Sequence, residues 1–208
     1  MKCKNIIEPL SIIVIFIIMF IIIINVPIIA RYKNSGDLII NEVVSANKNV
    51  IESTDGNSYD FIELYNGYDY DINLSGYYLS DDSFNLKKWS FDDIIINANS
   101  YLIVYASGLN KYENEEIHTN FKLSKDGEVL TLSNPKMNVL SRIYFSKTNT
   151  DTSYGYNGEN YVYFYVPTPG EENSTFYSKN PIKDIEISIL SRLLAKEKRM
   201  NFMRNCMT

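Results

Sequence analysis

Cysteine and histidine are scarce in this sequence. Its 208 residues include two cysteines, Cys3 and Cys206, which lie at the two ends of the chain, and a single histidine, His118. The region between the cysteines can therefore form no disulfide and no thiolate metal site, so its stability must come from packing. A Ser-His-Asp or Cys-His site would have to use His118, and no nucleophile-elbow pattern accompanies this residue. We expect no catalytic residue and no cofactor.

Charge is absent from one long stretch, residues 10–30, which read LSIIVIFIIMFIIIINVPIIA. A helix of about 20 apolar residues crosses a hydrocarbon core of roughly 30 Å. A cleaved signal peptide has a shorter apolar centre and a small-residue cleavage site, for which residues 28–30 are a poor match. The run predicts one N-terminal transmembrane helix, with a signal peptide as the alternative. Residues 1–9 would be a cytoplasmic leader, and the remainder would lie outside the cell membrane, or be secreted if the segment is cleaved.

Positive charge is scarce in the middle of the chain. Residues 31–172 contain 11 Lys/Arg and 21 Asp/Glu, a net charge of −10, whereas residues 174–208 contain 7 and 3, a net charge of +4. An acidic surface repels phosphate backbones, so nucleic-acid binding is disfavoured. The basic tail could form a short amphipathic helix.

From Asp37 onward, apolar and polar residues alternate in short bursts separated by Gly, Asn, Asp and Ser, which is typical of strands and turns. No long helical period is present. The expected strands are 38–44, 60–65, 76–79, 88–91, 101–106, 119–123, 128–133, 140–145 and 162–166. This spacing predicts an all-β, antiparallel β-sandwich. Two prolines in the segment 167–170 cannot continue a central strand, so we expect the domain to end near Asn173.

Several segments occur in an order that is specific in combination. They are LIINEVV (38–44), DFIELYN (60–66), INLSGYYLSDD (72–82), KWSF (88–91), NANSYLIVYASG (97–108), HTNFKLSKDGEVLTLSNP (118–135), DTSYGYNG (151–158) and PTPGEEN (167–173). Together they resemble the lamin tail domain. The resemblance implies an immunoglobulin-like β-sandwich over residues 34–173. Such domains occur in nuclear lamins and, with divergent sequence, in many secreted or surface-anchored bacterial proteins, usually as accessory modules.

Alternation within these motifs predicts the core. In residues 60–66, Ile62 and Leu64 share one face and should point inward. Leu74, Tyr78 and the single tryptophan, Trp89, are natural core or core-edge residues, and a buried indole N–H needs a partner. For His118, whose position recurs in the HTNFKLS-like stretch of the resembled family, we expect a structural hydrogen bond at the start of a strand.

Acidic pairs are the other residues with possible chemistry. Asp81-Asp82 and Asp92-Asp93, with Asp69 and Asp71 nearby, could supply oxygen ligands for Ca²⁺ if their loops meet at one end of the sandwich. Their spacing is not that of an EF-hand, and acidic loops are more often merely solvated. We therefore assign no metal site.

These observations favour a membrane-anchored module for binding or display, whose partner is another envelope protein or a cell-wall polymer. Two alternatives stay open. Residues 174–188 (STFYSKNPIKDIEIS) resemble the segment that follows this module in CotH-type spore-coat kinases, and the pattern changes after Ser188 as in a truncated or shifted reading frame. The chain would then be the targeting domain of such a kinase. The other alternative, an accessory nucleic-acid-binding module of a secreted nuclease system, conflicts with the negative charge.

Overall fold

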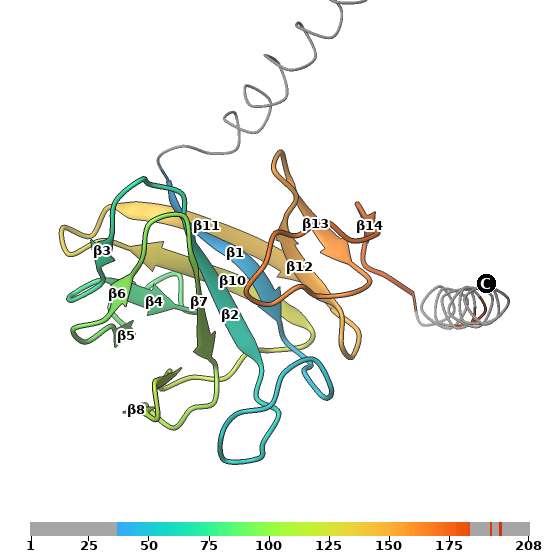
Figure 1. Ribbon diagram of the computed structural model, residues 1–208, viewed down its shortest axis with the longest axis horizontal. Coiled ribbons are helices and arrows are strands. Elements are labelled where there is room, and N and C mark those ends of the chain that lie inside the picture. Colours follow the sequence, from blue (N-terminus) through green and yellow to red (C-terminus); the bar gives the residue numbers. More distant parts are fainter. Residues whose placement is uncertain (1–36, 184–191, 193–195, 197–208) are drawn as a thin grey trace, which may run out of the picture. The chain divides into compact units, whose positions relative to one another are not determined.

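The computed structural model describes residues 37–183 together with Arg192 and Lys196. The apolar run at residues 10–30 lies outside the described residues, and so does most of the basic tail. No helix within the described part of the chain is long and apolar enough to span a bilayer. In residues 37–183 every helix or strand element is a strand, as the alternating pattern predicts. The strands form three antiparallel or mixed sheets (Figure 1).

The largest sheet has eight strands in the order β14-β13-β12-β1-β2-β7-β9-β8. Their bounds are β1 Leu38–Val44, β2 Phe61–Asn66, β7 Tyr101–Tyr105, β8 Lys111–Glu113, β9 Glu116–His118, β12 Ser153–Tyr156, β13 Tyr161–Phe164 and β14 Tyr177–Ser178. Neighbouring strands are antiparallel except β7 and β9, which pair in parallel through Tyr105 and His118. Strands β14 and β8 therefore form its two edges.

The second sheet has four strands in the order β11-β10-β4-β5. Their bounds are β4 Tyr78–Ser80, β5 Trp89–Ser90, β10 Gly127–Ser133 and β11 Val139–Ser146. A short ladder between β3 (Ile72–Asn73) and β6 (Ile95–Ile96) completes the described strands. The edge of the four-stranded sheet at β5 lies toward the β8 end of the large sheet (Figure 1).

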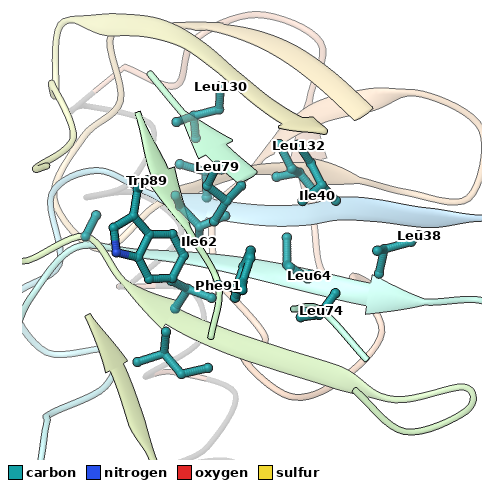
Figure 2. Packing of buried hydrophobic residues seen from close by; sticks show 14 of the residues in the cluster. Leu38, Ile40, Ile62, Leu64, Leu74, Leu79, Trp89, Phe91, Leu130 and Leu132 are labelled. Atoms are coloured by element: carbon teal, nitrogen blue, oxygen red, sulfur yellow. The ribbon is translucent and has the colours of Figure 1, made fainter. Parts of the chain in front are cut away.

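The core lies between these two sheets. Figure 2 shows Leu79, Leu130 and Leu132 of the four-stranded sheet close to Ile40, Ile62 and Leu64 of the large sheet. All six side chains are fully buried, as are Leu74 and, nearly, Trp89. The inward positions of Ile62 and Leu64 are those that the alternation predicts. Burying each such aliphatic side chain contributes about 1.5–3 kcal/mol, so this interface dominates the stability of the sandwich.

Most of the expected strands agree with the structure, and Leu38–Val44 agrees end for end. The strand expected at 119–123 is wrong. Strand β9 instead ends at His118, and the following segment makes only an isolated bridge between Lys122 and Ser107. Thr119 explains the early ending, because its hydroxyl donates to the carbonyl of Phe121 and turns the chain out of the ladder.

The sheet continues beyond Asn173, the residue near which the sequence predicts the end of the domain. Strand β14 pairs with β13 through Ser178 and Tyr177. Ile182 is buried, and its carbonyl accepts a hydrogen bond from the Asn149 side chain at 2.6 Å. Residues 174–183 therefore belong to the folded sandwich.

Candidate functional site

A cleft of about 370 Å³ lies between the edge strands of the two sheets. Strand β5 contributes one wall, and strands β8 and β9 contribute the other. The lining residues are Lys87, Lys88, Trp89, Ser90, Asp92, Ile94, Asn110, Lys111, Tyr112, Ile117, His118 and Asn120. The volume is within the usual range for small-ligand sites, and the lining is mainly polar.

The loop between β4 and β5 positions the first wall. Ser80, fully buried, donates to the carbonyls of Asp82 and Asn85, and the Asp82 carboxylate accepts the Phe84 N–H at 2.8 Å. The Lys88 ammonium lies 2.6 Å from the Asp81 carboxylate. These local bonds fix the loop and place Lys87 and Lys88 at the cleft.

Two hydrogen bonds join the walls across the back of the cleft. The Trp89 indole N–H donates to the Asn110 Oδ1 at 3.1 Å, and the Asn120 Nδ2 donates to the Lys88 carbonyl at 2.8 Å. The partner expected for the buried indole is thus Asn110, which has a positive φ of 51° just before β8. Asparagine tolerates this left-handed conformation better than most residues.

A tight turn positions the second wall. Asn114 and Glu115, between β8 and β9, have φ values of 51° and 65°, the signature of a type I′ hairpin turn. Lys111 in β8 lies across the same short ladder from His118 and pairs with Glu113 at 2.8 Å. The hairpin therefore holds Lys111 and Tyr112 at the mouth of the cleft.

His118 lies at the base of the cleft and is buried. Its Nδ1 is 3.0 Å from the Ser107 Oγ, and its ring stacks on Tyr105 with centroids 5.2 Å apart. Its Nε2 has no hydrogen-bond partner, since the nearest carboxylate oxygen, of Glu116, is 3.7 Å away. Burial lowers the pKa of His118, so the ring is neutral at pH 7.

The Ser107–His118 contact places a hydroxyl beside an imidazole, as in hydrolases, but the hydroxyl is inaccessible. Ser107 is 2% exposed, and its Oγ also accepts the Leu109 N–H at 3.2 Å. The nearby Glu116 carboxylate accepts hydrogen bonds from Ser53 and Thr54 instead of orienting the ring. Ser107 is buried and is not among the residues that line the cleft.

The two aspartate pairs considered as Ca²⁺ ligands have separate surroundings, and Asp71 accepts the Ala98 N–H. Asp81 pairs with Lys88, Asp82 caps its own loop, and Asp93 accepts a hydrogen bond from the Asn73 side chain at 2.7 Å. Asp92 lines the cleft. The described residues contain no group of three or more His, Cys, Asp or Glu side chains that could hold a metal ion.

A buried pair of carboxylates, Glu42 and Glu63, forms a second polar cluster that sequence reasoning missed. The two residues are direct partners across β1 and β2, on the face of the sheet opposite the core, and both are fully buried. A bulge at Asn41, where the register shifts, turns Glu42 to this face. The motif IELYN carried a signal for Glu63, which alternates with the core residues Ile62 and Leu64, whereas Glu42 has the same parity as Ile40 and reaches this face only through the bulge.

The loop 167–173 covers this pair. The Thr168 N–H donates to Glu42, and the Gly170 N–H donates to Glu63. The other two carboxylate oxygens accept from Ser153 and from Asn41. Burial raises the pKa of Glu42 to about 7 and that of Glu63 to about 8, and in Glu63 the nearby Glu42 adds to the effect.

All four oxygens of the Glu42–Glu63 pair thus have partners from the domain itself. Both side chains are fully buried beneath the loop, so an outside ligand does not reach these oxygens. The pair fastens the loop to the sheet, and we interpret it as structural. The cleft between β5 and β8 is the candidate functional site.

The family model described as Lamin Tail Domain matches residues 32–147. This span includes strands β1 to β11 and every residue that lines the cleft. None of the curated proteins compared with the chain matches it.

Proposed function

The chain belongs to the lamin tail domain family, and from this premise we propose that it is a non-catalytic, membrane-anchored module that binds an envelope component through the cleft between β5 and β8. Lamin tail domains are immunoglobulin-like binding domains in general. Our proposal adds the surface used for binding, the location and the partner.

One observation carries the choice of surface. The two sheets leave a polar cleft between their edge strands, and its walls are held by contacts that the domain makes with itself, including Trp89 to Asn110 and Asn120 to Lys88. A preorganised site loses little entropy when a ligand binds, which favours recognition at this place.

The uncharged run at residues 10–30 supports the location. It is long enough to cross a bilayer, and a large domain that follows such a segment is normally translocated. The partner would then be another envelope protein or a cell-wall polymer, since these are what an anchored extracytoplasmic domain meets.

Cosedimentation tests the surface. The full 208-residue chain, purified in a mild non-ionic detergent, is mixed with insoluble envelope material and centrifuged. We expect saturable binding that the double variant Lys87→Ala/Lys111→Ala weakens by about tenfold, because two favourable contacts are lost. The control, Lys125→Ala/Lys136→Ala, removes the same charge from exposed turns away from the cleft and should bind like the unmodified chain. Equal binding by both double variants would exclude the cleft.

Protease accessibility tests the location. Intact cells that express the chain with a C-terminal epitope are treated with protease. An extracytoplasmic domain loses the epitope without lysis, whereas a cytoplasmic one keeps it until the cells are opened. The second result would contradict membrane display.

A further inference from the structure

The chemistry of the cleft points to a class of ligand. We propose that the cleft binds an anionic glycan, a sugar chain whose units carry acidic groups. This inference rests on the proposed function and specifies its ligand. It is carried by three observations: the lysines that gather in an otherwise acidic domain, the amide and hydroxyl groups between them, and the aromatic residues beside them.

Three of the lining residues are lysines and one is a carboxylate, Asp92. Two of these lysines pair with carboxylates beside the lining, Asp81 and Glu113, so the cleft is close to neutral in a domain whose residues 31–172 carry −10 overall. Lys87 lies over the Tyr78 ring at 5.7 Å and has no carboxylate partner among the described residues. An acidic ligand is therefore repelled less at the cleft than elsewhere on the domain, and Lys87 offers it an ammonium group.

The other two lysines are held in pairs that a ligand can replace. Lys111 pairs with Glu113, and both side chains are substantially exposed, at 34% and 59%. Exposed pairs of this kind contribute little to stability, because water already screens them. Lys88 is about as exposed, at 33%, but its partner Asp81 is only 13% exposed, so this pair is held more firmly than that of Lys111. Lys87 and Lys111 are thus the two ammonium groups available for acidic groups on a ligand.

Neutral polar groups lie between the lysines. Asn110 uses its Oδ1 for Trp89, which leaves its Nδ2 as a donor. Asn120 uses its Nδ2 for the Lys88 carbonyl, which leaves its Oδ1 as an acceptor. Ser90 and Tyr112 add hydroxyls. Ligand hydroxyl groups both donate and accept, so a sugar matches this mixture better than a simple anion does.

Aromatic surface borders the same groups. Tyr112 is 55% exposed in β8, and an exposed phenol ring at a polar cleft gives a sugar ring a flat apolar face on which to pack. Trp89 lines the inner wall and is nearly buried, so it shapes the cleft. The combination of rings, amides and ammonium groups is that expected for an acidic sugar.

An acidic peptide is the competing ligand, and the strands disfavour it. A peptide that adds to a sheet edge gains its affinity from a ladder of backbone hydrogen bonds. The edges at the cleft are short, since β5 has two residues and β8 has three. Lining side chains, and not backbone edges, therefore dominate the recognition.

The chain carries its own reporter for a binding test. Trp89 is the single tryptophan and lies in the cleft, so its fluorescence reports occupancy directly. The full chain is titrated with oligogalacturonate, with a neutral glucose oligomer of equal length, and with a polyglutamate peptide. Calorimetry is run in parallel to detect binding that leaves the fluorescence unchanged.

We expect saturable binding of oligogalacturonate that added salt weakens, because the attraction is between charges. The Lys87→Ala/Lys111→Ala variant should bind it about tenfold more weakly, and Lys125→Ala/Lys136→Ala should bind it normally. Thermal unfolding of both variants should match that of the unmodified chain, which excludes misfolding as the cause.

Three results would overturn the proposal: no binding of oligogalacturonate by either method, equal binding of the neutral oligomer, or equal or tighter binding of polyglutamate. If oligogalacturonate fails while the chain still cosediments with envelope material through the cleft, the ligand class is wrong and the proposed function stands. If both experiments fail, both proposals are wrong.

Discussion

The paired glutamates Glu42 and Glu63 make the stability of the domain depend on pH. Each side chain is fully buried, each has its oxygens satisfied, and burial still raises both pKa values, to about 7 and about 8. An unfolded chain ionises the same groups near 4.5. The folded domain therefore holds protons at neutral pH that the unfolded chain releases.

This difference makes stability depend on pH. For both carboxyl groups the pKa in the folded chain lies above that in the unfolded chain. Their contribution to stability is therefore fully present below about pH 4.5 and is lost as pH rises through about 8. We predict that the free energy of unfolding falls by an amount on the order of 6 kcal/mol between about pH 5 and pH 9, because each pKa unit between the folded and the unfolded chain corresponds to about 1.4 kcal/mol. Denaturant unfolding across this range measures it, and a flat profile would contradict the account.

The Glu63→Gln variant isolates one of the groups. This variant removes the titration of residue 63, so the free energy of unfolding should fall less steeply as pH rises. Part of the pH dependence remains, because burial also raises the pKa values of Glu42 and Glu128 to about 7. Absolute stability should drop by about 1–2 kcal/mol, since the amide nitrogen faces a donor. Exposed Glu113→Gln is the control for the removal of one carboxylate charge from the surface.

At this scale the sequence predicts apolar residues better than polar ones. Alternation places Ile62 and Leu64 in the core, because the hydrophobic effect acts on each residue separately. The burial of Glu42 and Glu63 depends on a bulge at Asn41 and on a loop more than 100 residues away, and neither leaves a periodic signal. The cleft likewise forms only when β5 and β8 meet in space.

At the scale of elements, the loop 167–173 is fastened to the large sheet at several points. The Asn173 side chain is buried and donates to the carbonyls of Asn41 and Tyr156, at 3.1 and 3.0 Å. Gly155 makes room for it, since a Cβ there would lie 2.8 Å from the Asn173 Nδ2. The loop connects β13 to β14, so these contacts hold the β14 edge of the sheet in place.

Removal of this side chain should loosen the loop. We predict that Asn173→Ala lowers the free energy of unfolding by about 1–3 kcal/mol, because two buried carbonyls lose their donor. Amide hydrogen exchange should speed up in residues 167–178 and not in β10. The matched control, exposed Asn160→Ala, should change neither quantity, and an unchanged loop in Asn173→Ala would show that the backbone bonds alone hold it.

The elements that the sequence misses are short. Strands β3, β6 and β14 have two residues each, too few to show a period of two, and β12 (Ser153–Tyr156) has no aliphatic residue. Long strands such as β10 and β11 are predicted well because each carries its own alternation. Short edge strands instead acquire their structure from the neighbours with which they pair.

At the scale of the whole molecule, the packing of one sheet on the other provides the stability of a domain that has no disulfide between residues 37 and 183. Leu130 is fully buried at this interface. We predict that Leu130→Ala costs about 2–5 kcal/mol, while Val139→Ala, on a residue 43% exposed, costs much less. Equilibrium unfolding of both variants checks this, and equal costs would mean that the sheets do not share one core.

The central claim is that this sandwich binds its partner in the cleft between β5 and β8. Hydrogen exchange of the full chain, measured with and without solubilised envelope polymer, tests it most directly because it surveys every amide. The account predicts new protection confined to residues 87–94 and 110–120, the two segments that contain the residues lining the cleft. Protection that appears instead at the β14 edge or the loop 167–173, or protection nowhere, would contradict it.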